Sequence, residues 1–425
     1  MEVSIIAIGD ELLIGQVVDT NSGNLAKLMA PFGWQVKQVE VVADNAEAIK
    51  AAIDRAMMST DVVLTTGGLG PTKDDITKPL LCKYFGGELV RDPEVTGNIE
   101  EIFRKRGIKM NTLTADQALV PTSCRVIQNR VGTAPIMWFE RDGKVLVSMP
   151  GVPFETLQMF ESAIMPQLLE KFPNEEAIEH RTVIVANVTE SALAIQLDQW
   201  ERALPENFHL AYLPKPGIIR LRLDGHGTDG ALLKKEIDRL HAELSEIVKD
   251  NVIAIHDATI GEALLEHARG ARLTVATAES CTGGAIASQL TAIAGCSDVY
   301  VGGVVAYSNE LKHTALGVDM AVIERYGAVS SEVAAQMAQG VAKLTGADVA
   351  VATTGIAGPT GATGERRLPD GLVIEAKPVG TVWFGVYAKG NLMTFCRCFP
   401  GTRDRVIDRA ATTALTALIK AIKAN

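Results

Sequence analysis

The sequence predicts an α/β protein in which a small α+β unit separates two α/β units. Three observations indicate this class. Runs of strand character alternate with amphipathic segments of helical spacing over residues 2–66. From about residue 173 the pattern changes to short strands and one long charged helix, and a second alternation of buried strands and helices begins near Gly261. Such alternation is typical of a parallel, doubly wound sheet with helices on both faces.

The composition limits the functions to be considered. With 425 residues, two or three domains are expected, and 47% hydrophobic and 22% charged residues are usual for a soluble globular protein. The net charge of -10, without a long Lys/Arg cluster, argues against general affinity for nucleic acid. The six scattered cysteines predict neither a zinc site nor a disulfide framework. Without a cleavable signal or a membrane-spanning apolar run, we expect a reduced, cytoplasmic protein with no membrane partner.

Polar stretches in the first unit follow its predicted strands. The pattern predicts strands over 2–8, 34–42, 62–66 and 144–148, with helices over 21–32 and 46–59. In doubly wound sheets ligands bind at the carboxyl ends of the strands. Asp10, Glu11 and Asn21 follow the first strand, and Met-Pro-Gly-Val-Pro at 149–153 follows a later one. These residues are therefore candidates for a ligand site.

The loop over residues 65–75 is the most informative stretch of this unit. Its glycines could wrap phosphates with backbone N–H groups, and we select Gly67, Gly68, Gly70 and Thr72 as site residues. Asp74 and Asp75 follow, and two carboxylates beside a polyanion would need a cation such as Mg²⁺ between them. The alternative is a tight turn whose aspartates open the next helix. The loop is neither a Walker A loop nor a dinucleotide fingerprint.

The middle unit is predicted to be a small α+β module. The pattern predicts strands over 181–186 and 218–223 and helices over 189–199 and 232–248. Gly227-Thr228-Asp229-Gly230 matches the GxxG of RNA-binding KH modules, but it follows a strand and carries an aspartate. We interpret it as a strand-to-helix turn. Residues 250–260 are interpreted as a linker.

The second α/β unit centres on Ser280. A buried strand over 273–278 precedes this serine and a helix over 285–293 follows it, with Thr282, Gly283 and Gly284 at the helix start. A helix N-terminus suits a phosphate or a developing oxyanion, and a hydroxyl beside it is a candidate nucleophile. The alternative, in which Ser280 and Thr282 only cap the helix, stays open on this stretch alone.

A nucleophilic serine needs a base. Tyr307 and Lys312 follow the next buried strand, over 299–307, and both could face the Ser280 turn. A buried lysine with a depressed pKa can serve as general base, with a tyrosine orienting the proton. The alternatives are a half-buried strand tyrosine and an exposed helix lysine. Cys281 is a rival nucleophile, although no partner marks it.

The remaining elements complete the second α/β unit. A helix at 333–344 precedes a strand at 349–353, which ends in Thr-Gly-Ile-Ala-Gly-Pro at 354–359. A hairpin over 381–399 turns near Lys389, and the last helix is predicted over 403–423.

Several motifs in the same order make the chain similar to the CinA family, the competence/damage-inducible proteins. Those of the last third are Ala-Glu-Ser-Cys-Thr-Gly-Gly at 278–284, Tyr-Ser-Asn at 307–309 with Lys312, Thr-Gly-Ile-Ala-Gly-Pro, and Pro-Val-Gly-Thr-Val at 378–382. Those of the first third are Gly-Asp-Glu-Leu-Leu, Asp-Thr-Asn-Ser at 19–22, Gly-Gly-Leu-Gly-Pro-Thr and Met-Pro-Gly-Val-Pro. The resemblance covers essentially the whole chain. It implies a molybdopterin-binding-like domain (1–172), a KH-like domain (173–250), a linker (251–260) and an amidohydrolase domain (261–425).

The resemblance implies a deamidase in the last domain. Nicotinamide mononucleotide would lose ammonia and give nicotinic acid mononucleotide without a cofactor, with Ser280 as nucleophile and Tyr307 and Lys312 as the activating pair. Thr282, Gly283 and Gly284 would hold the substrate through backbone N–H groups. The remaining implied substrate-binding residues are Thr354, Gly355 and Gly358, and Arg403 for the phosphate. The loop over 360–376 is longer than the family pattern and could be a lid or an oligomer contact.

The resemblance also implies an activity for the first domain. Some family members cleave ADP-ribose to AMP and ribose 5-phosphate with a divalent cation, which Asp74 and Asp75 would hold here. Asp10, Glu11 and Asn21 would hold the ribose or the metal. We expect a homodimer. One alternative is a non-catalytic nucleotide-binding protein that acts as a partner of competence or recombination machinery, and another is a molybdopterin-binding protein with an appended domain.

Overall fold

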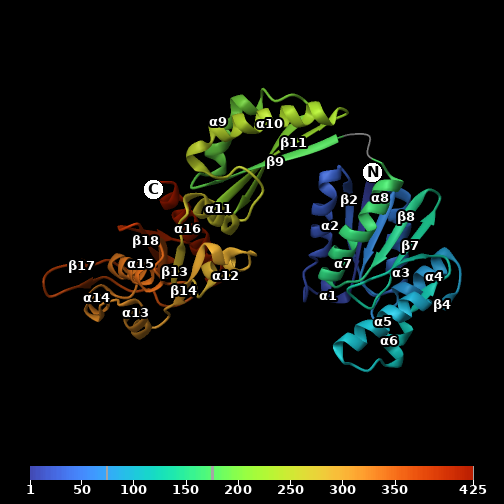
Figure 1. Cartoon of the computed structure of the whole chain (residues 1–425), viewed down its shortest axis with the longest axis horizontal. Helices are drawn as coiled ribbons and strands as arrows, with labels where there is room; N and C mark the ends of the chain where they lie inside the picture. Colours follow the sequence, from blue (N-terminus) through green and yellow to red (C-terminus); the bar gives the residue numbers. More distant parts are fainter. Residues whose placement is uncertain (73–74, 174–176, 425) are drawn as a thin grey trace. The chain divides into compact units, whose positions relative to one another are not determined.

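The structure is a computed structural model that describes residues 1–72, 75–173 and 177–424. The chain divides into two compact units, one formed mainly by residues 1–179 and the other mainly by the rest (Figure 1). The described part contains no helix that is long and apolar enough to cross a membrane.

The first unit is built on a six-stranded sheet with the order β2-β1-β3-β8-β7-β6. Strands β2, β1, β3 and β8 are parallel, as predicted, whereas β7 and β6 extend the sheet in antiparallel fashion. A short β-hairpin turn at Asp142-Gly143 joins β7 to β8 and permits this reversal. The strands are β1 (Glu2–Ile8), β2 (Gln35–Val42), β3 (Val62–Thr66), β6 (Arg125–Ile127), β7 (Ile136–Arg141) and β8 (Lys144–Met149).

Helices cover both faces of this sheet because successive strand side chains point to opposite sides. Ile5 packs with Leu25 of α2 on one face, and Ile6 packs with Ile49 and Ile53 of α3 on the other. The helices are α1 (Asp10–Leu13), α2 (Asn21–Met29), α3 (Ala46–Ser59), α4 (Thr77–Phe85), α5 (Pro93–Arg106), α6 (Thr112–Asp116), α7 (Pro153–Met159) and α8 (Met165–Lys171). Strands β4 (Leu89–Arg91) and β5 (Leu119–Pro121) form a separate two-stranded antiparallel sheet.

The middle sheet has the order β10-β11-β9-β12. Its elements are β9 (Ala177–Ala186), α9 (Glu190–Glu201), β10 (Phe208–Lys215), β11 (Ile218–Gly227), α10 (Gly230–Ile247) and β12 (Val252–Ala254). Strand β10 was not predicted, and the residues of β12, which pairs with β9, were predicted to be linker. The interpretation of Gly227–Gly230 as a turn from strand to helix is confirmed, and Asp229 accepts hydrogen bonds from the N–H groups of Ala231 and Leu232.

The last sheet has the order β14-β13-β15-β18-β19. Strands β14 (Tyr300–Val305), β13 (Val275–Glu279) and β15 (Val349–Gly355) are parallel, and the hairpin of β18 (Thr381–Ala388) and β19 (Asn391–Cys398) adds two antiparallel strands. Helices α11 (Ile260–Ala271), α12 (Ala285–Thr291) and α16 (Arg403–Lys423) pack on one face. Helices α13 (Asn309–Leu316), α14 (Met320–Tyr326) and α15 (Ser331–Thr345) pack on the other.

The long loop over 360–376 contains a short β-hairpin. Its strands, β16 (Arg366–Arg367) and β17 (Val373–Ile374), have two residues each. Side-chain bonds hold it against α14. Arg325 pairs with Asp370, and Arg366 donates to the carbonyl of Arg325. The loop therefore has a defined structure of its own.

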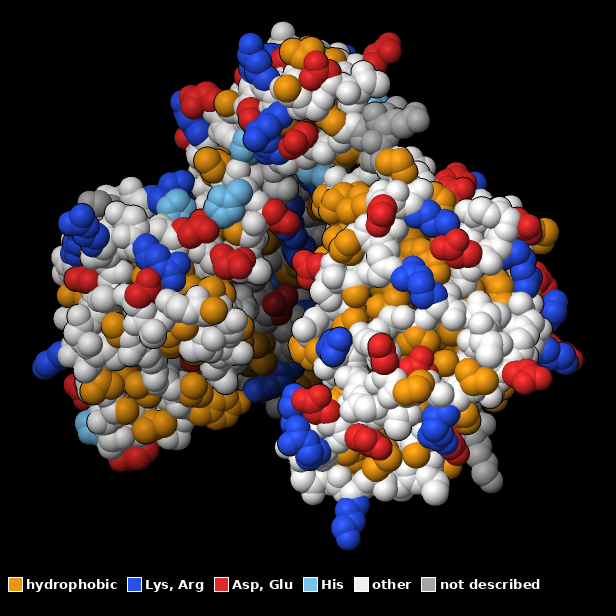
Figure 2. Space-filling model, turned by 45° about the vertical axis from the view of Figure 1, so that its right-hand side comes forward, with side chains coloured by type: hydrophobic (Ala, Val, Ile, Leu, Met, Phe, Trp, Pro, Cys, Tyr) orange, Lys and Arg blue, Asp and Glu red, His pale blue; other side chains and the backbone are white. Residues whose placement is uncertain are grey.

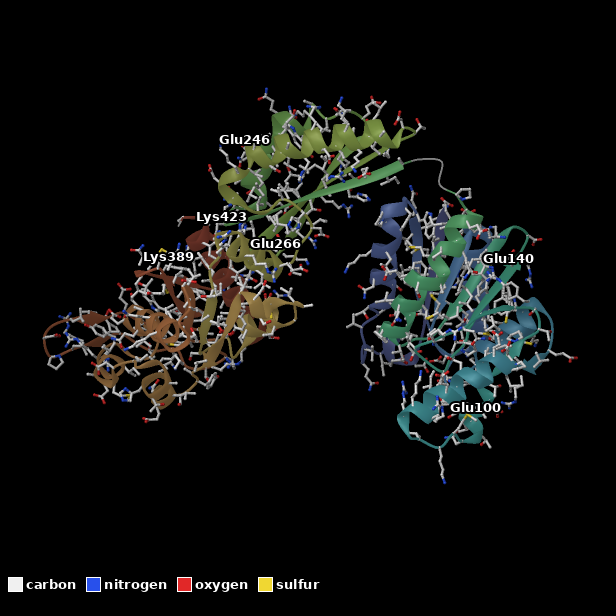
Figure 3. The ribbon with its side chains drawn as sticks, in the orientation of Figure 1. Glu100, Glu140, Glu246, Glu266, Lys389 and Lys423 are labelled. Carbon is white, nitrogen blue, oxygen red and sulfur yellow. The ribbon has the colours of Figure 1, made fainter. Side chains whose placement is uncertain are left out.

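Acidic and basic side chains are interspersed over the surface. On the face drawn in Figure 2, Lys and Arg side chains alternate with Asp and Glu and form no large basic patch. Of the charged residues labelled in Figure 3, Glu100 on α5 and Lys389 at the β18–β19 turn are exposed, whereas Glu140 pairs with Lys171.

Candidate functional sites

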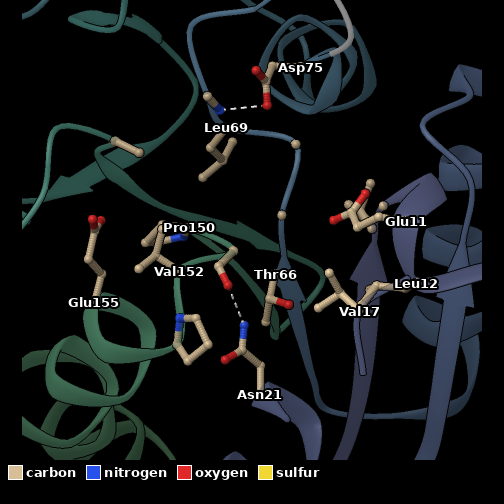
Figure 4. Close-up of a pocket in the computed structure, with 18 of the residues that line it drawn as sticks. Glu11, Leu12, Val17, Asn21, Thr66, Leu69, Asp75, Pro150, Val152 and Glu155 are labelled. Atoms are coloured by element: carbon tan, nitrogen blue, oxygen red, sulfur yellow. Dashed lines mark hydrogen bonds between the residues drawn. The ribbon is translucent and has the colours of Figure 1, made fainter. Parts of the chain in front are cut away.

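The three polar stretches of the first unit meet around one cavity of about 480 Å³. Glu11, Asn21, Gly67, Gly68 and Gly70 all line it, as does the segment Pro150–Pro153 (Figure 4). The carboxyl ends of β1, β3 and β8 are neighbours in the sheet, which explains why segments so distant in sequence converge. The fold thus brings these predicted residues together around one cavity.

The glycine loop rests directly on the ends of two strands. Gly67 has φ of +106°, and a Cβ atom there would lie 2.2 Å from the carbonyl oxygen of Ile8. Its N–H donates to the carbonyl of Met149 (3.1 Å). Any side chain at this position would push the loop away from β1, so only glycine fits.

Asp75 organises the loop itself. Its carboxylate accepts hydrogen bonds from the N–H groups of Gly70 (2.7 Å) and Thr72 (2.9 Å) and from the Thr72 hydroxyl (2.5 Å). Thr72 does not line the 480 Å³ cavity but an adjoining one of about 170 Å³. Asp74 lies outside the described residues. The structure thus gives Asp75 a structural task that the sequence analysis did not foresee.

Of the predicted residues Asn21 and Asp10, only Asn21 lines the cavity. The side chain of Asn21 is buried, and its Nδ2 donates to the carbonyl of Gly151 (2.8 Å), which ties α2 to the loop after β8. Its Oδ1 has no partner among the described residues, so an acceptor remains for a ligand. Asp10 does not line the cavity. Its carboxylate accepts a hydrogen bond from the N–H of Asp44 (3.3 Å), and its contact with a ligand stays a prediction.

All charged side chains that line this cavity within the described residues are acidic. Within the described part of the chain its lining contains no Lys or Arg, and its acidic members are Glu11, Asp19, Asp44, Asp75 and Glu155. Asp44 and Glu155 were not predicted as site residues, because only tertiary folding brings them to the cavity. The nearest buried cation is Lys78 in the adjoining cavity, where Nζ donates to the carbonyl of Gln117 (2.7 Å) and burial lowers the pKa of the ammonium to about 8.

The donor set fits a divalent cation only in part. Mg²⁺ bound together with phosphate needs one or two protein carboxylates, and the lining supplies these. Among residues 1–72, 75–173 and 177–424, however, no group of three or more His, Cys, Asp or Glu side chains could hold a metal alone. A cation at this site would therefore depend on ligand oxygens and water for most of its coordination.

In the second α/β unit Ser280 occupies the turn between β13 and α12, as predicted. The serine is buried, and its N–H donates to the carbonyl of Thr353 (3.0 Å) at the end of the adjacent strand β15. Gly283 and Gly284 have φ of +62° and +98°. These left-handed conformations suit glycine and allow the chain to turn sharply into α12.

The N-terminus of α12 is already occupied by Glu279. This carboxylate is 1% exposed and accepts hydrogen bonds from the N–H groups of Gly284 (3.0 Å), Ile286 (3.1 Å) and Ala287 (2.8 Å). The N–H of Gly283 donates to the carbonyl of Ser280 (3.1 Å). The N–H groups of Gly283 and Gly284 thus have partners within the motif, and their contact with a substrate stays a prediction.

Lys312 is buried close to the same turn. Its Nζ donates to the carbonyls of Ala306 (3.0 Å) and Tyr307 (3.3 Å), and burial lowers the pKa of the ammonium. The N–H of Ala306 in turn donates to the carbonyl of Glu279 (2.8 Å). A short chain of hydrogen bonds thus connects Lys312 with the residue that precedes Ser280. Lys312 is not the exposed helix lysine of the alternative interpretation.

Tyr307 and Arg403 contact each other. The Tyr307 ring is 61% exposed, and its hydroxyl accepts a hydrogen bond from Nη2 of Arg403 (2.8 Å). The Nη1 atom of Arg403 donates to the carbonyl of Gly358 (2.9 Å). The structure therefore joins three predicted residues from three separate motifs at one place.

The other predicted residues lie deeper. The hydroxyls of Thr282 and Thr353 are hydrogen-bonded (2.7 Å), and the Thr354 hydroxyl donates to the carbonyl of Ala328 (2.7 Å). A Cβ atom on Gly355 would come within 3.0 Å of the Cys281 sulfur, so Gly355 makes room for that side chain. Burial raises the pKa of the Cys281 thiol to about 12, which leaves almost no thiolate at neutral pH and disfavours Cys281 as nucleophile.

The fold defines a protein with two α/β domains joined by a small α+β domain, and three family models match three successive segments of the chain. Residues 4–170 match the family described as "Probable molybdopterin binding domain", 180–254 the "Damage-inducible protein CinA KH domain" and 257–422 the "CinA C-terminal domain". The chain is 38% identical to a "CinA-like protein" of Flavobacterium psychrophilum over 430 residues, covering 100% of this chain and 99% of that protein.

A second relative covers the chain equally well. The chain is 40% identical over 428 residues to a "Putative competence-damage inducible protein" of Caldicellulosiruptor saccharolyticus, covering 99% of each. Among solved structures, a CinA superfamily protein of Escherichia coli is 37% identical and covers 38% of this chain and 87% of that one, with a TM-score of 0.34. The chain belongs to the CinA family.

Proposed function

We propose that the last domain hydrolyses the amide of nicotinamide mononucleotide to nicotinic acid mononucleotide and ammonia. The observation that carries this proposal is the buried Lys312, whose pKa is lowered by burial and whose hydrogen-bonded segment adjoins the Ser280 turn. A neutral amine is the kind of base that a serine nucleophile requires at moderate pH.

The reaction would proceed through an acyl-enzyme. The Ser280 hydroxyl oxygen forms a bond to the amide carbon, and its proton passes to the neutral amine of Lys312, directly or through the Tyr307 hydroxyl. The carbon–nitrogen bond then breaks, and the nitrogen takes up this proton and leaves as ammonia. Water hydrolyses the ester with the same base, which restores Ser280 and gives the carboxylate. The chain needs no cofactor for these steps.

Ammonia release from nicotinamide mononucleotide tests this proposal. The full-length protein should release one ammonia for each nicotinic acid mononucleotide formed, both measured in the same samples. A protein that binds the nucleotide without forming either product would support the alternative, a non-catalytic partner of competence or recombination machinery.

We further propose that the first domain cleaves ADP-ribose to AMP and ribose 5-phosphate with the help of a divalent cation. The supporting observation is the 480 Å³ cavity with a glycine loop on one side and carboxylates around it. A pyrophosphate could enter such a lining only with a cation to offset the repulsion, and a bound cation would supply charge neutralisation at the phosphates. Asp75 and Asp74 remain the proposed carboxylates for it.

The decisive measurement uses the full chain with Ser280→Ala, which removes the other proposed activity. Formation of AMP and ribose 5-phosphate that requires added Mg²⁺ or Mn²⁺ would support hydrolysis. Saturable binding of ADP-ribose without turnover at any supplied metal would instead indicate a regulatory nucleotide site.

A further inference from the structure

Two cationic side chains donate hydrogen bonds to Tyr307, one to its backbone carbonyl and one to its hydroxyl. Lys312 donates to its carbonyl (3.3 Å) and Arg403 donates to its hydroxyl (2.8 Å). The ring itself is largely exposed, so the core does not fix the hydroxyl. Its position depends mainly on the bond from Arg403, a residue that starts α16 almost one hundred positions later.

The two cations lie close enough to the Ser280 turn to act on it. Lys312 and Arg403 both favour the charged form of Cys281, the residue after Ser280, through their positive charges. Arg403 also donates to the carbonyl of Gly358 (2.9 Å), in the loop after β15, which fixes its guanidinium at that loop. One guanidinium therefore contacts both the loop after β15 and the proposed proton-transfer tyrosine.

The Arg403–Tyr307 bond cannot compete well with a phosphate. A phenol oxygen is a neutral acceptor, whereas a phosphate dianion forms charge-assisted hydrogen bonds that are roughly twice as strong and often bidentate with arginine. If Arg403 receives the substrate phosphate, as the proposed deamidase function requires, the bond to the Tyr307 hydroxyl is the weaker of the two. The hydroxyl then becomes free to turn toward Ser280.

We propose that Arg403 and Tyr307 form a phosphate-sensing pair that makes the deamidase specific for nucleotides over nucleosides in the chemical step. Without a phosphate, Arg403 holds the Tyr307 hydroxyl away from proton transfer. With a phosphate, Arg403 turns to the anion and releases the hydroxyl. The inference rests on the proposed deamidase function and adds to it a role for binding energy in activating the tyrosine.

The pair predicts behaviour that a simple phosphate clamp does not. Nicotinamide riboside, which lacks the phosphate, should be turned over slowly even at saturation. Phosphite dianion added in solution can occupy Arg403 and should raise kcat for the riboside on the order of 10- to 100-fold, the effect of one charge-assisted hydrogen bond. Removing Arg403 should also free the hydroxyl, so Arg403→Ala should turn over the riboside faster than the wild type and lose the response to phosphite.

The experiment compares full-length wild type, Arg403→Ala, Tyr307→Phe and, as a matched control, Arg405→Ala. Arg405 is an exposed arginine in the same first turn of α16. Ammonia release is measured from the mononucleotide and from the riboside, with and without phosphite. Activation in the wild type and in Arg405→Ala, with none in Arg403→Ala or Tyr307→Phe, is expected.

Two results would overturn the inference separately from the proposed function. If the wild type deamidates the mononucleotide but phosphite leaves riboside turnover unchanged, the deamidase stands and the coupling is absent. Equal riboside kcat in the wild type and Arg403→Ala would likewise reduce Arg403 to a binding residue. If the wild type releases no ammonia from the mononucleotide, the proposed function fails, and the inference with it.

Discussion

The two candidate sites of this chain are opposite in charge. The lining of the N-terminal cavity contains five carboxylates and, within the described residues, no Lys or Arg, whereas the Ser280 site lies beside the cations Lys312 and Arg403. An anionic substrate must therefore bring positive charge with it to the first site, but finds it already present at the second. If the proposed functions hold, we therefore expect ADP-ribose cleavage to require a divalent cation and amide hydrolysis to proceed without one.

The sites also differ in what forms them. Backbone loops at the ends of three parallel strands form the first, and a buried carboxylate and a buried lysine fix the second from within. Backbone donors can bind phosphates of many ligands, whereas a fixed hydroxyl and base suit one reaction. Each prediction below tests one side of this contrast.

The largest effect is expected for Ser280→Ala. Removal of a nucleophile that works with a base typically lowers kcat by several orders of magnitude, so ammonia release should fall at least about 1,000-fold. Binding of the mononucleotide, measured by calorimetry, should change little because few ground-state contacts are lost. Cys281→Ala serves as control and should keep most of the activity. A dead Cys281→Ala together with an active Ser280→Ala would reverse the assignment.

Removal of divalent cations should separate the two activities. EDTA should reduce ADP-ribose cleavage at least about 100-fold, since the carboxylate lining repels the pyrophosphate, and should leave ammonia release unchanged. Re-addition of Mg²⁺ or Mn²⁺ should restore AMP formation, followed by chromatography. Equal sensitivity of both activities to EDTA would contradict the contrast in charge.

Sequence patterns located both sites but not their internal bonding. Periodicity placed Ser280 on a strand-to-helix turn and Gly67 after a buried strand, because strand and helix signals are local. Periodicity could not show that Glu279 turns back to satisfy α12, nor that Asp75 organises the glycine loop, since both depend on side-chain direction. From the sequence, Asp75 is predicted to hold a cation, and Glu279 has no predicted role.

The strands that were missed have a similar explanation. Phe208–Lys215 contains a proline and has little regular alternation, and it forms β10 only because β11 offers an edge to pair with. Residues 252–254 are too few for a periodic signal, yet they pair with β9. Tertiary pairing decided both cases. The parallel strands of the two α/β units were predictable from their apolar runs, whereas β7, which pairs with β8 in antiparallel fashion, was not predicted.

Arg403→Ala should mainly raise the KM for nicotinamide mononucleotide. Loss of a charge-assisted bond to phosphate costs roughly 1.5–3 kcal/mol, or about a 10- to 100-fold increase. The kcat at saturation should change much less, because the same substitution releases the Tyr307 hydroxyl. Steady-state kinetics with Arg405→Ala as the matched control checks this, and an unchanged KM would show that another group binds the phosphate.

The deamidase should lose activity as pH falls, because a protonated Lys312 cannot accept the serine proton. Burial lowers the pKa of Lys312, so the neutral base becomes abundant at a lower pH than for an exposed lysine. The log of kcat should rise by about one for each pH unit below that pKa and level off above it. Lys312→Arg stays protonated and should lose both the rise of kcat with pH and most of the activity. A wild-type kcat that does not change with pH would exclude Lys312 as the base.

The smallest effect is expected for Glu279→Gln. The amide keeps the size of the side chain but replaces one acceptor oxygen with a donor, which would face an N–H group of α12. Leaving a buried donor unpaired costs about 1–3 kcal/mol, so urea denaturation should show a loss of this size in the free energy of unfolding. Since Ser280 follows directly, kcat should also fall a few-fold, while KM stays constant because Arg403 is unaffected. Glu310→Gln on the exposed start of α13 is the matched control and should change neither quantity. A Glu279→Gln protein with wild-type stability would show that the carboxylate charge is not what holds the start of α12.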